Sequence, residues 1–356
     1  MTAAPDLTLR QVPLASIERA DWDRLLALTP AATPFARWTF HRAWWDAYGD
    51  AAVEQYLIAT DADSDSPRAI VPLMRRNAPE SEREAIYFGA SYHADYATIL
   101  GAAADMQGVA DGLANVLQRW SETIPGDQAW SALDLRRLRP ADPALVALDT
   151  SLNRPTSRWP LSRTIEDVCP VVTVPGSDWD EYLAMLHKKH RHEIRRKIRR
   201  AAAIGEVSID VAAPTQDAID GFIALHNARF GEDGLFPNSQ DGERSRYFVH
   251  RLAELERAEE DSGQLHVGLV RCGERLVFAM LAFDDGHTCY LYNSGMDPAA
   301  AEASPGVTGT AAYLKDRMAA GRRRFDYLRG AESYKYQWGA QDEPIERLLV
   351  VRSDES

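Results

Sequence analysis

Four polar side chains near the C-terminus form the densest group in the sequence that could carry acid–base chemistry. They are Asp326, Glu332, Tyr334 and Lys335, and all four are candidate catalytic residues. A carboxylate can take a proton from an amine or hold that amine by charge, and a phenol can donate a proton to a leaving group. We therefore predict Glu332 as a general base or amine anchor and Tyr334 as a proton donor. The structural alternative is that Glu332 and Lys335, three residues apart, only pair with each other.

A loop before a predicted helix has the residue types of an anion site. Ser304 can cap the helix, Pro305 suits its first position, and Gly306 has no side chain to keep an anion from the backbone amides. Exposed amides and the positive end of the helix dipole favour a pyrophosphate. Val307 lies in the same first turn, and Thr308 offers a hydroxyl donor. The alternative is an ordinary capped helix that binds nothing.

Charge is distributed unevenly along the chain. The formal net charge is −13, but one stretch carries eight cationic residues against a single carboxylate, Glu193, which gives it a local charge of +7. A basic patch on an acidic body suits a polyanionic ligand, and we predict Arg191 and Arg195 as ligand contacts. The alternative is the solvated face of a helix. The cationic residues are Lys188, Lys189, Arg191, Arg195, Arg196, Lys197, Arg199 and Arg200.

Composition places the chain among soluble globular proteins of two or three domains. It has 356 residues, of which 45% are hydrophobic and 26% charged. The longest apolar run, Leu276–Phe283, is far shorter than the roughly 20 residues that span a bilayer. The N-terminal residues have neither a basic leader nor a continuous apolar stretch, so no secretory signal is predicted. We expect a cytoplasmic protein without membrane insertion.

Cysteine and histidine usage predicts neither disulfides nor a metal site. The cysteines are odd in number and lack C-x-x-C spacing, so they are expected to be reduced and mostly buried. Three histidines lie within or beside the basic stretch, where neighbouring cations would repel a divalent ion. The residues concerned are Cys169, Cys272, Cys289, His187, His190 and His192.

Periodicity predicts an α/β protein. In the second half, Ser177 is the expected N-cap of a helix that continues through the basic stretch to Gly205. Three strands in a row follow later, with turns at Cys272-Gly273 and Asp285-Gly286. The other elements expected there are a strand at 207–212, helices at 218–230, 243–260 and 305–320, and strands at 324–330 and 346–353.

The first half alternates helices and strands before an aperiodic connection. Helices are expected near 22–28, 40–50 and 105–123, and strands at 55–61, 68–74, 86–90, 97–101 and 131–136. Residues 139–168 contain four prolines and little sustained periodicity. We therefore predict a first domain at 1–150, a connecting segment at 151–168 and a second domain at 169–356.

The element order of the second half resembles the GNAT acyltransferase fold, in which a strand meander precedes a helix whose N-terminus faces the phosphates of coenzyme A. The strings SPG at 304–306, FDYLRG at 325–330 and ESYKYQWG at 332–339 look like the C-terminal pattern of the CelD-type branch. In the first half WTFHRAWWDAYG, VPL and DYATIL also fit, as do the basic helix and LHNARF. The resemblance runs from about residue 22 to 350. It implies two tandem GNAT-like domains, as in Fem-type transferases, each a mixed, mostly antiparallel sheet flanked by helices.

The resemblance also implies ligands. Acetyl-CoA or another acyl-CoA would be the co-substrate and an amine the acceptor. The pantetheine arm would lie beside Tyr292 and Asn293, where the strand at 290–294 splays from residues 325–328. Trp38, Asp95 and Tyr96 of the first half would contact the acceptor, although aromatic residues at such spacing also suit a core.

One departure from the family pattern concerns the phosphate loop. The usual pattern is Arg or Gln, two residues, Gly, one residue, then Gly or Ala, whereas the segment 303–308 keeps only Gly306 and ends in Thr308. The leading hypothesis is an acyl-CoA-dependent N-acyltransferase that acts on a small or saccharide-linked amine. A Fem-like transferase that uses aminoacyl-tRNA would explain both the altered loop and the basic helix. A third hypothesis is a catalytically silent binding protein in envelope or exopolysaccharide assembly.

Overall fold

The computed structural model describes residues 7–61, 66–77, 84–123, 130–155, 157–259 and 262–352, and the chain divides into two compact units. Unit 1 comprises residues 1–167 and 344–356, and unit 2 comprises residues 168–343. The predicted partition differs from this division at two places. Residues 151–167 belong to unit 1, and the last residues return to unit 1 because β15 (Gln341–Val351) pairs there with β8 (Ala132–Leu138).

Unit 2 is built on a mostly antiparallel sheet. Its strand order is β10-β11-β12-β13-β14-β9, and only the β13–β14 pair is parallel. The predicted meander is confirmed, and its two turns have Gly273 and Gly286 at positive φ. The strands are β10 (Val207–Ala212), β11 (Leu265–Cys272), β12 (Arg275–Asp284), β13 (Thr288–Met296), β14 (Arg324–Asp326) and β9 (Leu161–Thr173).

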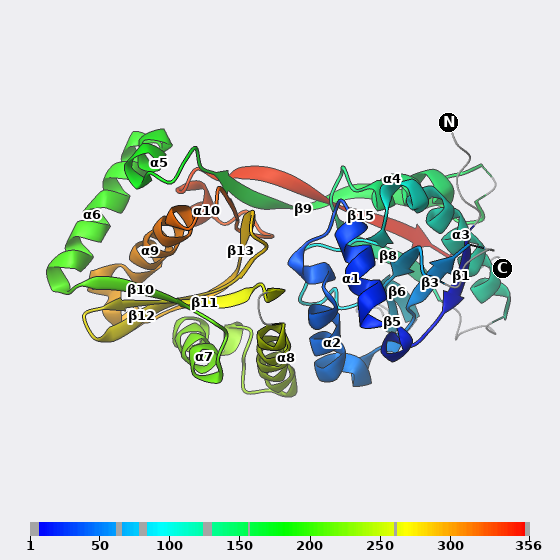
Figure 1. Cartoon of the computed structure of the whole chain (residues 1–356), viewed down its shortest axis with the longest axis horizontal. Coiled ribbons are helices and arrows are strands. Elements are labelled where there is room, and N and C mark those ends of the chain that lie inside the picture. The colour runs from blue at the N-terminus through cyan, green and yellow to red at the C-terminus, as the bar shows by residue number, and fades with distance from the viewer. Residues whose placement is uncertain are drawn as a thin grey trace. The chain divides into compact units, whose positions relative to one another are not determined.

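Helices cover both faces of the unit 2 sheet (Figure 1). The basic helix α6 (Lys188–Ile204) and α9 (Pro305–Ala319) lie on one face, and α7 (Gln216–Phe230) and α8 (Gln240–Ala258) on the other. The core beneath α6 and α9 includes Phe278, Tyr313 and Leu314, which are almost completely buried. Burial of this apolar face stabilises the unit at roughly 25 cal/mol per Å² of apolar surface.

Two glycines set how closely helices approach the sheet. A Cβ on Gly309 of α9 would lie 2.2 Å from Cγ of Phe278 on β12. A Cβ on Gly295 of β13 would lie 2.4 Å from the backbone nitrogen of His226 on α7. Any side chain at either position would therefore push the helix away from the strand.

The helix predicted to begin after Ser177 and run to Gly205 is two helices, so that prediction was wrong. Helix α5 (Trp179–Met185) is capped by Asp178, whose side chain accepts from the Glu181 amide. Leu186 then adopts an extended conformation, and α6 begins at Lys188. The end of α6 at Gly205 is as predicted.

Unit 1 contains two groups of strands and four α-helices among its described residues. The strand order is β1-β3-β4-β7 in one sheet and β15-β8-β6-β5-β2 in the other group. The helices are α1 (Arg19–Leu28), α2 (Trp38–Tyr48), α3 (Met106–Thr123) and α4 (Pro143–Leu152). The strands not yet bounded are β1 (Thr8–Gln11), β2 (Val53–Glu54), β3 (Leu57–Thr60), β4 (Ala69–Val71), β5 (Leu73–Asn77), β6 (Glu84–Phe88) and β7 (Leu100–Gly101).

Three expectations for unit 1 are corrected. The strand expected at 68–74 is divided at Pro72 into β4 and β5, which lie in different strand groups, because proline cannot donate to a ladder. The strand expected at 97–101 is only the short β7. The segment 139–168 is structured: Asp142 caps α4 by accepting from the Ala144 amide, and β9 begins at Leu161.

The three cysteines are buried and free. None of the helices in the described parts of the chain combines the length and apolarity that a bilayer crossing demands. The same residues contain no group of His, Cys, Asp or Glu arranged to hold a metal ion.

Candidate active site

The central strands of unit 2 separate part-way along their length. Strands β13 and β14 pair at Thr288↔Arg324, Cys289↔Phe325 and Tyr290↔Asp326, and the pairing ends there although β13 continues to Met296. The backbone groups on that side of β13 beyond Tyr290 are thus left without a strand partner from β14. The predicted splay between these strands is present in the structure.

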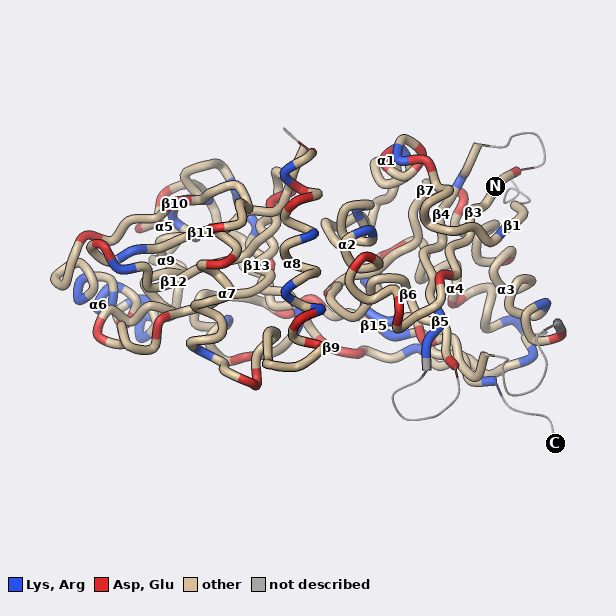
Figure 2. The backbone as a smooth tube through the Cα atoms, turned by 90° about the horizontal axis from the view of Figure 1, so that it is seen from below, with Lys and Arg blue, Asp and Glu red and all other residues tan. Residues whose placement is uncertain are grey.

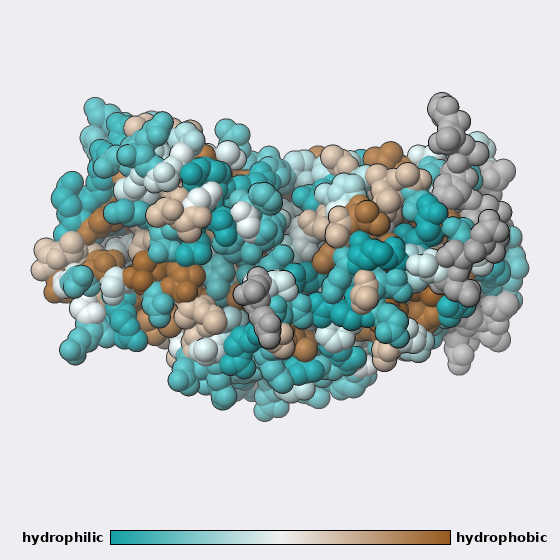
Figure 3. All heavy atoms as spheres, viewed as in Figure 1, coloured by the Kyte–Doolittle hydropathy of each residue, from teal (hydrophilic) through white to brown (hydrophobic). Residues whose placement is uncertain are grey.

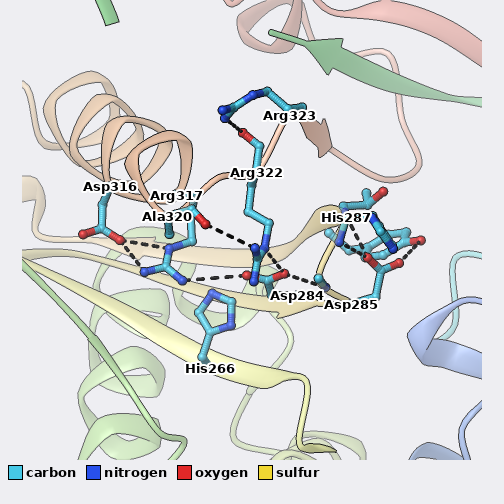
Figure 4. Close-up of polar contacts among 12 residues, drawn as sticks. His266, Asp284, Asp285, His287, Asp316, Arg317, Ala320, Arg322 and Arg323 are labelled. Carbon is cyan, nitrogen blue, oxygen red and sulfur yellow. Dashed lines mark hydrogen bonds and ion pairs between the residues drawn. The ribbon is translucent and has the colours of Figure 1, made fainter. Parts of the chain in front are cut away.

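A charged cluster fixes the closed end of this splay (Figure 4). Asp284, the last residue of β12, accepts from Arg322 Nε at 2.5 Å and lies 3.7 Å from Arg317 Nη1. Arg317 of α9 also pairs with Asp316 at 2.5 Å. Because these arginines come from α9 and from the turn that leads to β14, the cluster ties both to the β12–β13 hairpin.

A cavity of about 420 Å³ opens in unit 2 on the side where β13 and β14 diverge. Its walls come from β12, β13, the segment 297–304, the first turns of α9 and the segment after β14. Apolar side chains supply much of the wall. Figure 3 shows apolar patches on the face of unit 2 that is turned to the viewer. The lining residues that matter below are Lys197, Arg229, Ser294, Met296, Tyr334 and Trp338.

The N-terminus of α9 forms one wall of the cavity. Pro305 occupies the first helical position as predicted, and Ser304, Gly306 and Val307 line the cavity. Ser304 does not cap the helix with its side chain, contrary to the prediction, because it adopts a left-handed conformation with φ 50°. Its carbonyl oxygen instead accepts from the Val307 and Thr308 amides at 3.0 Å each.

These bonds limit the amides that an anion could use. Thr308 is 1% exposed, and its hydroxyl donates to the Ala303 carbonyl at 2.7 Å, so it does not offer the predicted donor to the cavity. Among the described residues, Gly306 retains the one first-turn amide of α9 without a recorded partner. Tyr292 and Asn293 lie on the part of β13 that does not pair with β14, and they are not part of the cavity wall.

The four candidate catalytic residues separate into two groups. Tyr334, on the short helix α10 (Ser333–Tyr336), lines the cavity and is 44% exposed. Burial and the Glu332 carboxylate raise its pKa, opposed by Arg229, so the phenol keeps its proton at neutral pH. Asp326 is 1% exposed and accepts from the Leu328 amide at 2.8 Å, so it serves the backbone rather than the cavity.

Lys335 has the structural role that was the alternative at the sequence level. Its ammonium is buried and donates to the carbonyls of Leu328, Arg329 and Gly330 at 3.1, 2.8 and 2.9 Å. It also pairs with Glu332 at 2.8 Å. Although burial acts in the opposite direction, the hydrogen bond from Lys335 lowers the pKa of Glu332. An ionised carboxylate held in this way anchors a cation better than it accepts a proton.

Figure 2 shows the Lys and Arg positions gathered along helix α6. Lys197 lines the cavity and lies 3.4 Å from Glu193, and Arg200 donates to the Glu302 and Ala301 carbonyls just before α9. The predicted contacts Arg191 and Arg195 are outside the cavity wall: Arg191 donates to the Ala184 carbonyl and Arg195 pairs with Asp180. Within the described chain, the side chains with no recorded partner on this helix include Lys188, Lys189 and Arg199.

The predicted acceptor contacts Trp38, Asp95 and Tyr96 belong to unit 1. Trp38 begins α2 and lies 5.0 Å beneath the Arg19 guanidinium. Tyr96 is 4% exposed and packs under Arg139 at 5.4 Å. Their contact with an acceptor stays a prediction.

Sequence reasoning missed several residues of the cavity wall, above all Arg229, Met296, Gln337 and Trp338. Arg229 lies in the LHNARF string, and the other two C-terminal residues lie in ESYKYQWG, so the strings were noticed but these side chains were not assigned. The missing information was the close packing of α7 on β13, which brings the end of α7 to the opened strand.

Comparison with known proteins identifies the architecture of this site. Residues 188–336 match the family model described as an acetyltransferase (GNAT) domain. Unit 2 carries a GNAT domain. The predicted superfamily and the predicted class of enzyme, an acyltransferase, are thereby confirmed. No match was found among curated proteins.

Solved structures show the fold of the whole chain around the GNAT domain. FemX superposes with a TM-score of 0.63 at 9% identity, over 96% of this chain and 97% of FemX. A conserved protein of unknown function from Bacteroides thetaiotaomicron gives a TM-score of 0.58 at 13% identity, over 97% and 99%. L-PGS from Bacillus licheniformis gives 0.54 at 11% identity, over 95% and 93%. At these identities the likeness establishes the fold alone, and it agrees with the predicted Fem-like architecture.

Proposed function

We propose that the GNAT domain transfers an acyl group from acyl-coenzyme A to an amine on a small or saccharide-linked acceptor. The end of β13–β14 pairing at Tyr290↔Asp326, beside a cavity of about 420 Å³, carries this proposal. The unpaired edge of β13 can hydrogen-bond the amides of a pantetheine arm as a third strand would. The carrier's phosphates would meet the Gly306 amide and the N-terminus of α9.

Tyr334 in the cavity wall and Glu332, two residues earlier and outside that wall, suit direct transfer without a covalent enzyme intermediate. The amine nitrogen attacks the thioester carbonyl carbon, the C–S bond breaks, and the departing thiolate takes a proton from the Tyr334 phenol. The amine loses its proton to solvent or to Glu332, which we propose as the amine anchor or general base. Holding both reactants in position supplies on the order of 7 to 11 kcal/mol of the barrier.

A second candidate donor, aminoacyl-tRNA, is favoured by one specific observation. The Val307 and Thr308 amides are already bound by the Ser304 carbonyl, which leaves little backbone for a pyrophosphate, while α6 presents its charge of +7 next to the cavity. A nucleic acid contacting several of these cations would release counterions, and its affinity would fall steeply with salt.

The experiment measures thermal unfolding and thiol release with acetyl-CoA, and tRNA binding at several salt concentrations. Saturation at 100 times the dissociation constant adds about 2.7 kcal/mol to the free energy of unfolding. Val307→Glu places a carboxylate in the cavity wall, where it would repel the phosphates of the carrier, and should abolish the acetyl-CoA shift. The matched pair Lys189→Glu and Arg199→Glu alters α6 outside the cavity wall and should weaken tRNA binding alone.

The outcomes separate the three hypotheses. A shift with acetyl-CoA that Val307→Glu removes, together with thiol release, supports the acyl-CoA-dependent enzyme. Salt-dependent tRNA binding that the α6 variants remove, without an acetyl-CoA shift, supports the aminoacyl-tRNA donor. Binding of neither donor would overturn both and favour a catalytically silent protein.

A further inference from the structure

One cation of the cavity wall lacks the carboxylate partner that many other guanidinium groups in the described parts of the chain have. Arg229 lies in the last turn of α7, and within the described residues it forms no ion pair with Asp or Glu. Its recorded contacts are a 3.4 Å hydrogen bond from Nη1 to the Ser294 hydroxyl and a position 4.4 Å over the Phe230 ring. Both are weak compared with a bidentate carboxylate pair.

Arg229 is a solvent-exposed residue that lines the cavity without a carboxylate beside it. Neighbouring protein displaces part of the water around the guanidinium and lowers its pKa. The group that opposes this effect is Tyr334, the proposed proton donor, so Arg229 lies near the reacting end of the cavity. A guanidinium at the cavity wall with no carboxylate partner can form charge-assisted hydrogen bonds with an anionic group of a ligand.

The other charged residues of the described cavity wall do not supply a carboxylate for Arg229. The Asp297 carboxylate, which also lines the cavity, is already paired with Arg275 at 2.5 Å. The remaining charged residue there is Lys197, a second cation, and Glu193 is its partner. The described wall therefore carries an excess of positive charge, with the Tyr334 and Ser294 hydroxyls beside it as additional donors.

We propose that Arg229 makes this end of the cavity a subsite for an anionic oxygen group, a carboxylate or phosphate, on the acceptor or on the acyl group itself. This inference rests on the proposed function, since it names the substrate class of the same site. A neutral amine with a neutral acyl group would offer the guanidinium no charged partner at this end of the cavity, where its one hydrogen bond among the described residues is the 3.4 Å contact with the Ser294 hydroxyl. Planar guanidinium and carboxylate groups match in a two-bond geometry, which a lysine cannot reproduce.

The test compares charged and neutral substrates of matched size. Butyryl-CoA and succinyl-CoA differ by a carboxylate in place of the terminal methyl of the acyl group, and an amino acid and its amide differ by a carboxylate on the acceptor. Thiol release is measured for each pair with the unmodified protein, with Arg229→Gln and Arg229→Lys, and with the control Arg251→Gln. Arg251 lies on α8, outside the cavity wall, and pairs with Glu254.

We expect one pair to show at least a tenfold preference for the charged member, which corresponds to about 1.4 kcal/mol. Arg229→Gln should reduce that preference to about threefold or less, Arg229→Lys should retain part of it, and Arg251→Gln should leave it unchanged. The pair that responds identifies which substrate carries the anion. Equal rates within both pairs, or a preference that survives Arg229→Gln, would overturn the proposal.

A second measurement separates this inference from the proposed function. Thermal unfolding is followed with sodium succinate and with inorganic phosphate at constant ionic strength. Stabilisation that disappears in Arg229→Gln but not in Arg251→Gln supports the anion subsite even if no acyl-CoA is used. The same response in both variants counts against the subsite, whereas absence of thiol release with every donor counts against the proposed transferase.

Discussion

The ammonium of Lys335 donates to the carbonyl of Gly330 at 2.9 Å and thereby closes the segment that follows β14. The carbonyls of Leu328 and Arg329 converge on the same ammonium, and Leu328 adopts a left-handed φ of 58°. A non-glycine residue in this region is strained, and the convergence on Lys335 offsets that strain. Because Tyr334 directly precedes Lys335, this segment also positions the phenol in the cavity wall.

Replacement of the buried ammonium tests this role. Lys335→Met should lower the free energy of unfolding by about 3 kcal/mol, because three carbonyls and the Glu332 carboxylate lose their donor. Denaturant unfolding measures the loss. Lys189→Met, an exposed position on α6, is the control and should change stability by less than about 0.5 kcal/mol. A similar small effect of Lys335→Met would contradict the structural role.

Removal of the Tyr334 hydroxyl should affect turnover and leave stability nearly unchanged. Tyr334→Phe is expected to lower kcat by about 10² to 10⁴ if the phenol protonates the leaving thiolate. Tyr247→Phe, at an exposed position on α8, is the control. Since the pKa of Tyr334 is raised above its usual value of 10.0, the active protonated form is retained through pH 9 and lost only at higher pH. A fall in kcat on the alkaline side that begins below pH 9 in the unmodified enzyme would argue against Tyr334 as the donor.

Glu332→Gln distinguishes anchoring of the amine from general-base catalysis. The amide still accepts a hydrogen bond from Lys335, so the variant should stay folded and lose about 1 kcal/mol of stability. An anchor that holds a charged amine should mainly raise KM for the acceptor, whereas a general base should mainly lower kcat. The lowered pKa of Glu332 favours the KM effect. Unchanged kcat and KM with a true substrate would remove Glu332 from the mechanism.

Local sequence signals predicted the scaffold of the site. The meander of β11, β12 and β13 follows from strand alternation and from glycines at Gly273 and Gly286, where positive φ is required. Helix α9 follows from its N-terminal proline and its apolar spacing. Such signals act between near neighbours in the chain, so they can be read without the tertiary structure.

The features that the sequence did not predict depend on the tertiary structure. The break between α5 and α6 at Leu186 has no proline or glycine to announce it, and Leu186 is buried in the core of unit 2. Lys335 was predicted as a catalytic residue because the sequence does not show that three carbonyls would bind its ammonium. Those carbonyls converge on Lys335 only when the segment 328–330 folds. Arg229 could not be assigned to the cavity without the packing of α7 against β13.

The approach of α7 to β13 can be tested at Gly295. Gly295→Ala should lower the free energy of unfolding by about 2 to 3 kcal/mol, because the new Cβ would meet the α7 backbone at 2.4 and 2.6 Å. The control is Gly221→Ala on α7, where the nearest atom is Leu276 Cδ2 at 3.6 Å. Helix propensity predicts stabilisation of up to about 1 kcal/mol for the control. Equal effects in the two variants would mean that the close approach does not constrain the strand.

Stability should fall in mild acid because of His266, which lies near the charged cluster of Figure 4. Its Nε2 is 2.6 Å from the Tyr313 hydroxyl. Burial, assisted by the positive charge of Arg317 and opposed by Asp284 and Asp316, lowers the pKa of His266 to about 4.

The direction of this pH effect on stability follows from proton binding by His266. Above the unfolded pKa of 6.5 the imidazole is neutral in both states, so pH has no effect through this group. As the pH falls below 6.5, His266 binds a proton in the unfolded chain but not in the folded chain. The free energy of unfolding therefore decreases until the pH reaches the folded-state pKa of about 4. Between pH 6.5 and 4.5 the loss is on the order of 2 kcal/mol.

His266→Gln removes this titration and keeps a polar side chain beside Tyr313. Denaturant unfolding at pH 6.5 and 4.5, at constant ionic strength, should show a smaller loss in the variant by on the order of 2 kcal/mol, even if the variant is less stable at both pH values. His41 and His93 of unit 1, whose pKa values burial lowers to about 3, should still contribute their own losses to both proteins. An identical pH dependence in the two proteins would show that His266 binds a proton equally in the folded and unfolded states.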